Sequence, residues 1–167
     1  QARAGLRHLD IGSGAGHWID FFRDVLLVQR SFAVEIVPEL ADQLRARYAD
    51  VEGVDVRAAD AADADFGPEQ FGGEVDHLSA IGVMFHIVDD ARWQRAVANL
   101  ARCLKPGGLL WIGGDFGSET RNVQFHTVDR FTSWREFQKA EAPPDEIRVN
   151  KRVRSLSTWV RSEEHTS

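Results

Sequence analysis

The 167-residue chain is long enough for one domain with a substantial core. Its 43% hydrophobic and 28% charged residues are typical of a folded globular protein and exclude a largely disordered one. A formal net charge of −6 argues against nucleic acid as a partner, because such binding needs a basic surface. No apolar run approaches the ~20 residues that cross a bilayer, so we expect a cytoplasmic protein without a membrane partner.

Short apolar runs alternate with segments of helical periodicity along the chain. Strands are predicted at residues 6–11, 32–36, 54–57, 75–81 and 109–112, and helices at 17–28, 38–48 and 89–104. This alternation predicts an α/β fold, with a doubly wound, mostly parallel sheet and helices on both faces. In the first helix we expect Trp18, Phe21 and Phe22 to lie in the core. The single cysteine, Cys103, has no disulfide or zinc partner, and we expect it to be buried.

A glycine-rich loop follows the first predicted strand. Gly12, Gly14 and Gly16 form a G-x-G-x-G pattern, and Asp10 stands two residues before its first glycine. Parallel sheets bind ligands at the carboxyl ends of their strands, and glycines let a ligand approach the backbone closely. The loop therefore predicts a ligand site, although its spacing differs from the dinucleotide pattern G-x-G-x-x-G.

An acidic residue, Glu35, ends the second predicted strand about twenty residues beyond the loop. A carboxylate at this position can accept hydrogen bonds from both hydroxyls of a ribose. It would also repel a 2′-phosphate, which argues against NADP. The alternative is that Glu35 simply ends a strand in solvent.

Four segments, in order and with suitable spacing, resemble the motifs of class I S-adenosylmethionine-dependent methyltransferases. They are residues 9–16 (LDIGSGAG), 59–61 (ADA), 75–87 (VDHLSAIGVMFHI) and 104–110 (LKPGGLL). The resemblance runs in register from residue 6 to about residue 115. It implies S-adenosylmethionine as the cofactor and the Rossmann-like fold of that family.

The resemblance assigns the methionine end of the cofactor to the first motif. Gly12, Gly14 and Gly16 would pass beneath the methionine part, and Asp10 would lie near its ammonium group. The alternative for Asp10 is a purely structural role, in which its carboxylate holds amides of the loop.

The resemblance assigns the nucleoside end to three later segments. Glu35 would hold the ribose hydroxyls and Asp60 would contact the adenine amino group. The main chain of Ala61 and the side chain of Ile81 would flank the adenine and the sulfonium region. Asp60 has an alternative role as an ordinary turn or cap residue, since other aspartates crowd the same stretch.

The chemistry of methyl transfer explains why no nucleophile motif is present. A sulfonium is already a good leaving group, so the enzyme mainly aligns donor and acceptor. His86, on the loop after the fourth predicted strand, is the candidate general base. It has the alternative role of lining the site without taking a proton. We predict no metal site and expect a small-molecule acceptor, whereas the acceptor atom and the oligomeric state are not predicted.

Three rival functions share parts of this pattern. An NAD-dependent oxidoreductase would use the same sheet, glycine loop and acidic residue, but would not explain residues 59–61 or the His86 loop. An aminopropyl transferase would need an acidic acceptor-site motif after the fourth strand, and none is present. A non-catalytic methyltransferase-like binding module would have no need of an intact glycine loop and Glu35.

The two ends of the chain carry predictions of their own. The chain starts with Gln1 rather than Met, and we recognise no strand pair after residue 112 that would complete the sheet. We therefore expect residues 1–160 to be a methyltransferase core truncated at both ends. Residues 161–167 read RSEEHTS, which is similar to the translation of a common sequencing adapter, and we expect them not to be biological.

Overall fold

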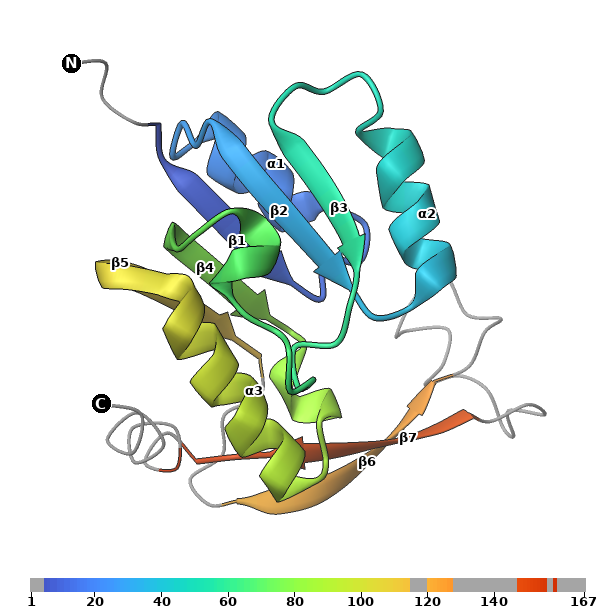
Figure 1. Ribbon diagram of the computed structural model, residues 1–167. Helices are drawn as coiled ribbons and strands as arrows, with labels where there is room; N and C mark the ends of the chain where they lie inside the picture. The colour runs from blue at the N-terminus through green and yellow to red at the C-terminus, as the bar shows by residue number, and fades with distance from the viewer. Residues whose placement is uncertain (1–4, 115–119, 128–146, 156–157, 159–167) are drawn as a thin grey trace.

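The computed structural model describes residues 5–114, 120–127, 147–155 and 158. Its centre is a five-stranded parallel sheet in the order β3-β2-β1-β4-β5 (Figure 1). The strands are β1 (Arg7–Ile11), β2 (Arg30–Glu35), β3 (Val54–Ala58), β4 (Val75–Ile81) and β5 (Leu104–Gly113). The order steps outward from β1 in both directions, so the predicted doubly wound parallel sheet is confirmed.

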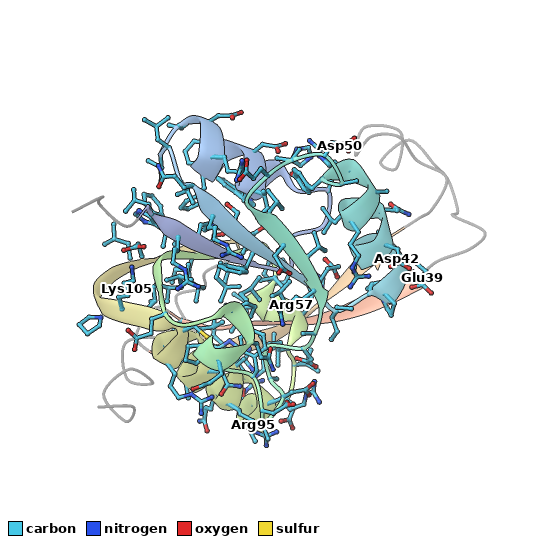
Figure 2. The ribbon with its side chains drawn as sticks, turned by 45° about the horizontal axis from the view of Figure 1, so that its top comes forward. Glu39, Asp42, Asp50, Arg57, Arg95 and Lys105 are labelled. Carbon is cyan, nitrogen blue, oxygen red and sulfur yellow. The ribbon has the colours of Figure 1, made fainter. Side chains whose placement is uncertain are left out.

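Helices cover both faces of the sheet (Figure 1). On one face, α1 (His17–Asp24) packs against β1 and β2, and α2 (Pro38–Arg47) against β2 and β3. On the other, α3 (Asp90–Cys103) packs against β4 and β5. The short 3-10 helices η1 (Pro68–Phe71) and η2 (Met84–His86) flank β4 in the sequence. Charged side chains such as Glu39, Asp42 and Arg95 project outward from α2 and α3 (Figure 2).

The pleat of β1 separates two cores. Leu9 belongs to the larger cluster, which it shares with Trp93 and Leu100 of α3. The opposite face carries a smaller cluster that includes Ile19 of α1 and Leu44 of α2. Because successive side chains of a strand point to opposite faces, both faces of the central strand are buried.

The helix boundaries follow local chemistry. The Asp89 carboxylate accepts a hydrogen bond from the Arg92 backbone N–H at 2.8 Å, which confirms the predicted cap of α3. Cys103, in the last turn of this helix, is fully buried as expected, and burial raises the pKa of its thiol to about 12. The helix gives way directly to β5, which therefore begins five residues before the predicted strand. A register shift between Val75 and His77 on β4 accommodates the extra residues.

The first helix departs from the prediction in length and in burial. α1 ends at Asp24 rather than at residue 28, and the chain then turns through Leu27, whose φ is 56°. Phe22 is buried as expected, whereas Trp18 and Phe21 are 36% and 39% exposed, so their placement in the core was wrong. Their flank of α1 is not covered by any element of the described residues, and helical periodicity cannot reveal a missing neighbour.

A second, two-stranded antiparallel sheet pairs β6 (Arg121–Thr127) with β7 (Ile147–Val153). No strand pair was predicted there, although both segments alternate apolar with polar residues, which is the pattern of a half-buried strand. The pair does not join the parallel sheet, so β5 remains an edge within the described residues. β7 lies beside η2 (Figure 1), and Arg154 just after it donates to the Ile87 carbonyl at 2.9 Å.

Two remaining predictions concern membrane spans and the last seven residues. In the segments that the structure describes, no helix combines the length and apolarity that a bilayer crossing requires. Residues 161–167, predicted to be an adapter translation, lie outside the described residues.

Candidate functional site

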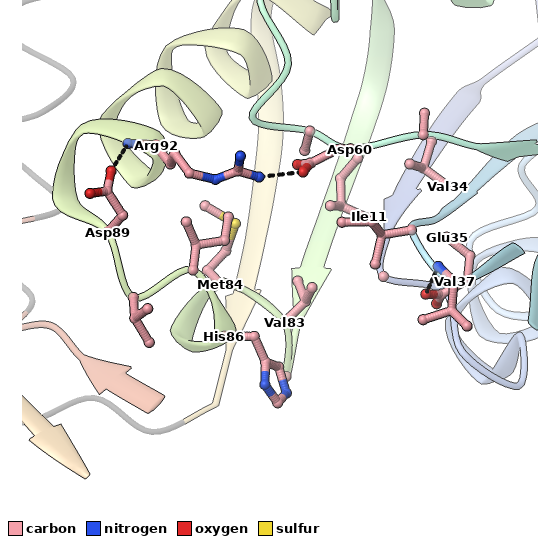
Figure 3. A pocket seen from close by; sticks show the side chains of 17 residues that line it. Ile11, Val34, Glu35, Val37, Asp60, Val83, Met84, His86, Asp89 and Arg92 are labelled. Carbon is pink, nitrogen blue, oxygen red and sulfur yellow. Dashed lines mark hydrogen bonds and ion pairs between the residues drawn. The ribbon is translucent and has the colours of Figure 1, made fainter. Parts of the chain in front are cut away.

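A pocket of about 550 Å³ opens at the carboxyl ends of β1, β2, β3 and β4 (Figure 3). Its volume is in the range of small-molecule sites. Of the residues predicted from sequence, those that line it are Gly12, Glu35, Asp60, Ala61 and His86. The structure does not place Asp10, Gly14, Gly16 or Ile81 among the lining residues.

The glycine loop turns sharply from β1 into α1. The backbone N–H groups of Gly12 and Ser13 both donate to the Val34 carbonyl, at 2.8 and 3.1 Å. A Cβ on Gly12 would lie 2.5 Å from a methyl carbon of Val83, and φ at this residue is +70°. Gly12 is therefore required both by backbone conformation and by the close approach of the loop to Val83.

Gly14 and Gly16 differ in what surrounds them. A Cβ on Gly16 would collide with the Tyr48 hydroxyl, which donates a hydrogen bond to the Gly16 carbonyl at 2.9 Å. A Cβ on Gly14 would meet only the Gly12 carbonyl oxygen, at 4.0 Å. Protein atoms thus fill the space at Gly16, whereas the space at Gly14 is open to a ligand.

Glu35 is held firmly at the end of β2. Its side chain accepts hydrogen bonds from the backbone N–H of Gly14 at 3.0 Å and of Val37 at 3.1 Å. The residue is only 6% exposed, so the alternative in which it ends the strand in solvent is wrong. Each carboxylate oxygen has a second lone pair, and the two oxygens can therefore still accept from a pair of vicinal hydroxyls.

Asp60 has the turn role that the sequence left open and also lines the pocket, whereas its contact with adenine stays a prediction. One carboxylate oxygen accepts from the backbone N–H of Ala62 at 2.8 Å, as a turn aspartate does. The other forms an ion pair with Arg92 across the pocket at 2.5 Å (Figure 3). Asp60 is therefore both a turn residue and a polar wall of the pocket.

Two residues of α3 that support this wall were not predicted. Arg92 pairs with Asp60, and the side-chain amide of Asn99 donates to the carbonyls of Ala61 and Asp63 at 2.9 and 2.8 Å. Asn99 is 3% exposed within an otherwise apolar helix face. A polar residue in such a stripe was the available signal, because a buried amide needs partners. Arg92 gave no signal, since its partner is distant in sequence.

His86 ends η2 and lines the pocket on the side opposite Glu35 (Figure 3). Its backbone N–H donates to the Val83 carbonyl at 3.0 Å, and its ring lies 4.7 Å from the ring of Phe85. His86 therefore borders the pocket, and its role as a base stays a prediction.

Asp10 and Ile81 lie near the pocket but do not line it. Ile81 lies against Gly113 of β5, where a Cβ on the glycine would be 2.9 Å from an Ile81 methyl carbon. Asp10 is 1% exposed and accepts a hydrogen bond from the Ser79 hydroxyl. Burial raises the pKa of the Asp10 carboxyl to about 6. Both side chains are thus occupied by neighbours on β4 and β5, and neither is among the residues that line the pocket.

In the described segments, no group of three or more His, Cys, Asp or Glu side chains is placed to hold a metal ion. The site thus offers open space at Gly14 and three carboxylates fixed by backbone N–H groups, those of Glu35, Asp60 and Asp89. Its lining is otherwise mostly apolar.

Solved structures with the same fold include several methyltransferases. The methyltransferase bound to the Trm112 activator in Haloferax volcanii is 21% identical, with a TM-score of 0.59, covering 98% of this chain and 62% of that one. An S-adenosylmethionine-dependent methyltransferase of Clostridium acetobutylicum is 12% identical, with a TM-score of 0.67 and coverages of 98% and 73%. The glycopeptide N-methyltransferase MtfA, in complex with S-adenosylmethionine, is 14% identical, with a TM-score of 0.65 and coverages of 99% and 72%.

These structural likenesses establish the fold, and the chain spans under two thirds of the Haloferax volcanii protein. Among curated protein sequences, none matches this chain closely. A family model described as "Methyltransferase domain" matches residues 9–108, which is more than half of the chain and contains the glycine loop, Glu35 and Asp60. The chain therefore belongs to the methyltransferase domain family.

Proposed function

We propose that this chain binds S-adenosylmethionine in the pocket and transfers its methyl group to a small-molecule acceptor. The observation that carries the proposal is the position of Glu35. Two backbone N–H groups hold its carboxylate beside the open space at Gly14 and in the same pocket as Asp60. These residues come from the ends of β2, β1 and β3, where a parallel sheet gathers its ligand contacts.

The polar groups match the parts of the proposed cofactor. Glu35 would accept from the ribose hydroxyls, and Asp60 with the Ala61 main chain would border the adenine. Gly12 and Gly14 would lie beneath the methionine part, which Asp10 would approach from below the loop. Ile81 would act only through the shape of the strand end, because its side chain packs at Gly113.

In the proposed reaction, the main task of the protein is to align the methyl donor with the acceptor. The bound sulfonium would supply an activated methyl group for in-line displacement. The chain's residues would fix the donor and exclude water, and such positioning can contribute ~7–11 kcal/mol. His86 would accept the proton that an oxygen or nitrogen acceptor loses.

The chain has a net charge of −6, which disfavours nucleic acid as an acceptor. The acceptor is therefore proposed as a small molecule. A peptide-derived acceptor is the second candidate, favoured by the likeness to a glycopeptide N-methyltransferase. An NAD-dependent oxidoreductase is disfavoured by family membership. A cytoplasmic location remains part of the proposal.

Transfer of tritiated methyl groups tests the proposed activity. The chain would be incubated with labelled S-adenosylmethionine and fractionated small-molecule or peptide extracts, with Glu35→Ala as the inactive control. Label in a small-molecule product that depends on Glu35 would support the proposal. Binding of the cofactor without label in any fraction would instead favour a non-catalytic binding module.

A further inference from the structure

A row of three polar side chains is buried between β1, β4 and α1. His8, Asp10 and Ser79 are each at most 1% exposed, and strand alternation puts them on the same face of the sheet as Glu35. The register pairs β1 with β4 so that Asp10 stands beside Ser79. Burying polar groups is costly unless they are hydrogen-bonded, so this row needs an explanation beyond packing.

The three side chains form one directed chain of hydrogen bonds. The Ser79 hydroxyl donates to one Asp10 oxygen, Oδ1, and therefore accepts from His8 Nε2, which lies 2.7 Å away. This direction requires a proton on Nε2 of His8. The ring also stacks on Phe22 with centroids 3.8 Å apart. Burial, together with the neighbouring His77, lowers the pKa of His8 to about 3, so the ring is neutral.

The second Asp10 oxygen, Oδ2, is different. It is fully buried and has no hydrogen-bond partner in the described part of the chain. Asp10 directly precedes Ile11 and Gly12, which line the pocket. A half-satisfied carboxylate at the base of the glycine loop can be completed by a cationic donor from the ligand.

We propose that Ser79 and His8 are positioning residues, which hold Asp10 so that its Oδ2 receives the ammonium group of the cofactor's amino-acid end. His8 orients the Ser79 hydroxyl, and that hydroxyl fixes Oδ1. The inference rests on the proposed cofactor site and assigns to two residues outside the pocket a part in recognising one end of the ligand.

The arrangement makes recognition of the ammonium dependent on pH. Asp10 must be ionised to receive a cation, and burial raises the pKa of this carboxyl to about 6, whereas the neighbouring Ser79 and Ser13 hydroxyls lower it. Glu35 on β2 is the other charged group that acts on Asp10. From α1, the buried Ile19 and Phe22 are uncharged.

Comparison of two ligands distinguishes recognition of the ammonium group by Asp10 from binding of the nucleoside part. S-adenosylhomocysteine carries the amino-acid end, and 5′-methylthioadenosine lacks it. Calorimetric titration of the full chain from pH 5 to 8 should show the affinity for S-adenosylhomocysteine falling below a midpoint near pH 6, with no such midpoint for 5′-methylthioadenosine. Asp10→Asn should remove the midpoint.

Substitution of the positioning residues should move that midpoint. Ser79→Ala removes a hydrogen bond to the charged form of Asp10, so the midpoint should rise by about one pH unit. Affinity for S-adenosylhomocysteine at pH 6 should then fall about fivefold. His8→Phe keeps the ring that stacks on Phe22 but removes the donor to Ser79, so it should raise the midpoint less than Ser79→Ala does. His8→Gln keeps a side-chain N–H donor and should leave the midpoint near its wild-type value. His77→Gln is the matched control and should leave the midpoint in place.

The outcomes are distinct. Equal losses for both ligands in Ser79→Ala, or an unchanged midpoint in a variant with a native circular dichroism spectrum, would overturn the positioning role alone. Failure of the unmutated chain to bind either ligand would overturn the cofactor site itself and the inference with it.

Discussion

Replacing Glu35 with Ala should weaken cofactor binding more than any other single change on the pocket wall. The wild-type carboxylate accepts from two backbone N–H groups, and in the proposed complex it also accepts from two ribose hydroxyls. Hydrogen bonds to a charged group are worth about 1.5–3 kcal/mol each. Loss of one such ribose bond already lowers affinity at least tenfold, and loss of both lowers it further.

The assay is a calorimetric double-mutant cycle. Wild type and Glu35→Ala would each be titrated with S-adenosylhomocysteine and with its 2′-deoxy analogue. The 2′-deoxy analogue should bind wild type more weakly than S-adenosylhomocysteine does. Its affinity should fall much less in Glu35→Ala, because it already lacks one of the two hydroxyls that Glu35 would bind. Glu39→Ala, an exposed change at the start of α2, serves as the control. The reasoning is refuted if Glu35→Ala costs less than threefold, or if both ligands lose equally.

Three further changes test other parts of the site. Gly14→Ala should fold, with a cost of about 1–2 kcal/mol for a left-handed alanine, but should abolish S-adenosylhomocysteine binding in calorimetry; retained affinity would mean that the open space at Gly14 is not used. His86→Ala should lower the maximal rate and remove a neutral inflection of the pH–rate profile while leaving cofactor affinity nearly unchanged; persistence of both returns His86 to a lining role. Asp10→Asn should gain stability relative to wild type as the pH rises from 4 through 6, approaching about 3 kcal/mol at pH 8, because the pKa of the buried carboxyl is raised to about 6. Urea unfolding at pH 4 and pH 8 measures this gain, and an equal difference at both values would contradict it.

Local chemistry made much of the fold predictable. Apolar runs of four to seven residues gave the five strands of the parallel sheet, and the cap at Asp89 gave the start of α3 within one residue. Glu35 was found because ligand contacts of a parallel sheet follow its strand ends, and Asp60 because residues 59–61 resemble a motif of the methyltransferase family. Such signals lie within a few residues of each other, so a single sequence carries them.

Features that depend on neighbours distant in sequence were not predictable. The exposure of Trp18 and Phe21 depends on what packs beside α1, and the pairing of Asp60 with Arg92 joins residues of separate elements. The packing of Ile81 at Gly113 depends on the pairing of β4 with β5. The row that links His8 to Asp10 through Ser79 exists only because two strands pair in one register.

Binding of S-adenosylhomocysteine, in competition with NAD⁺, tests the central claim most directly. Calorimetric titration of the 167-residue chain should show one saturable site for S-adenosylhomocysteine, weakened at least tenfold in Glu35→Ala, and no change in the wild-type affinity when millimolar NAD⁺ is present. Saturable binding of NAD⁺ that displaces S-adenosylhomocysteine, or wild-type affinity in Glu35→Ala, would contradict the assignment of this pocket to S-adenosylmethionine.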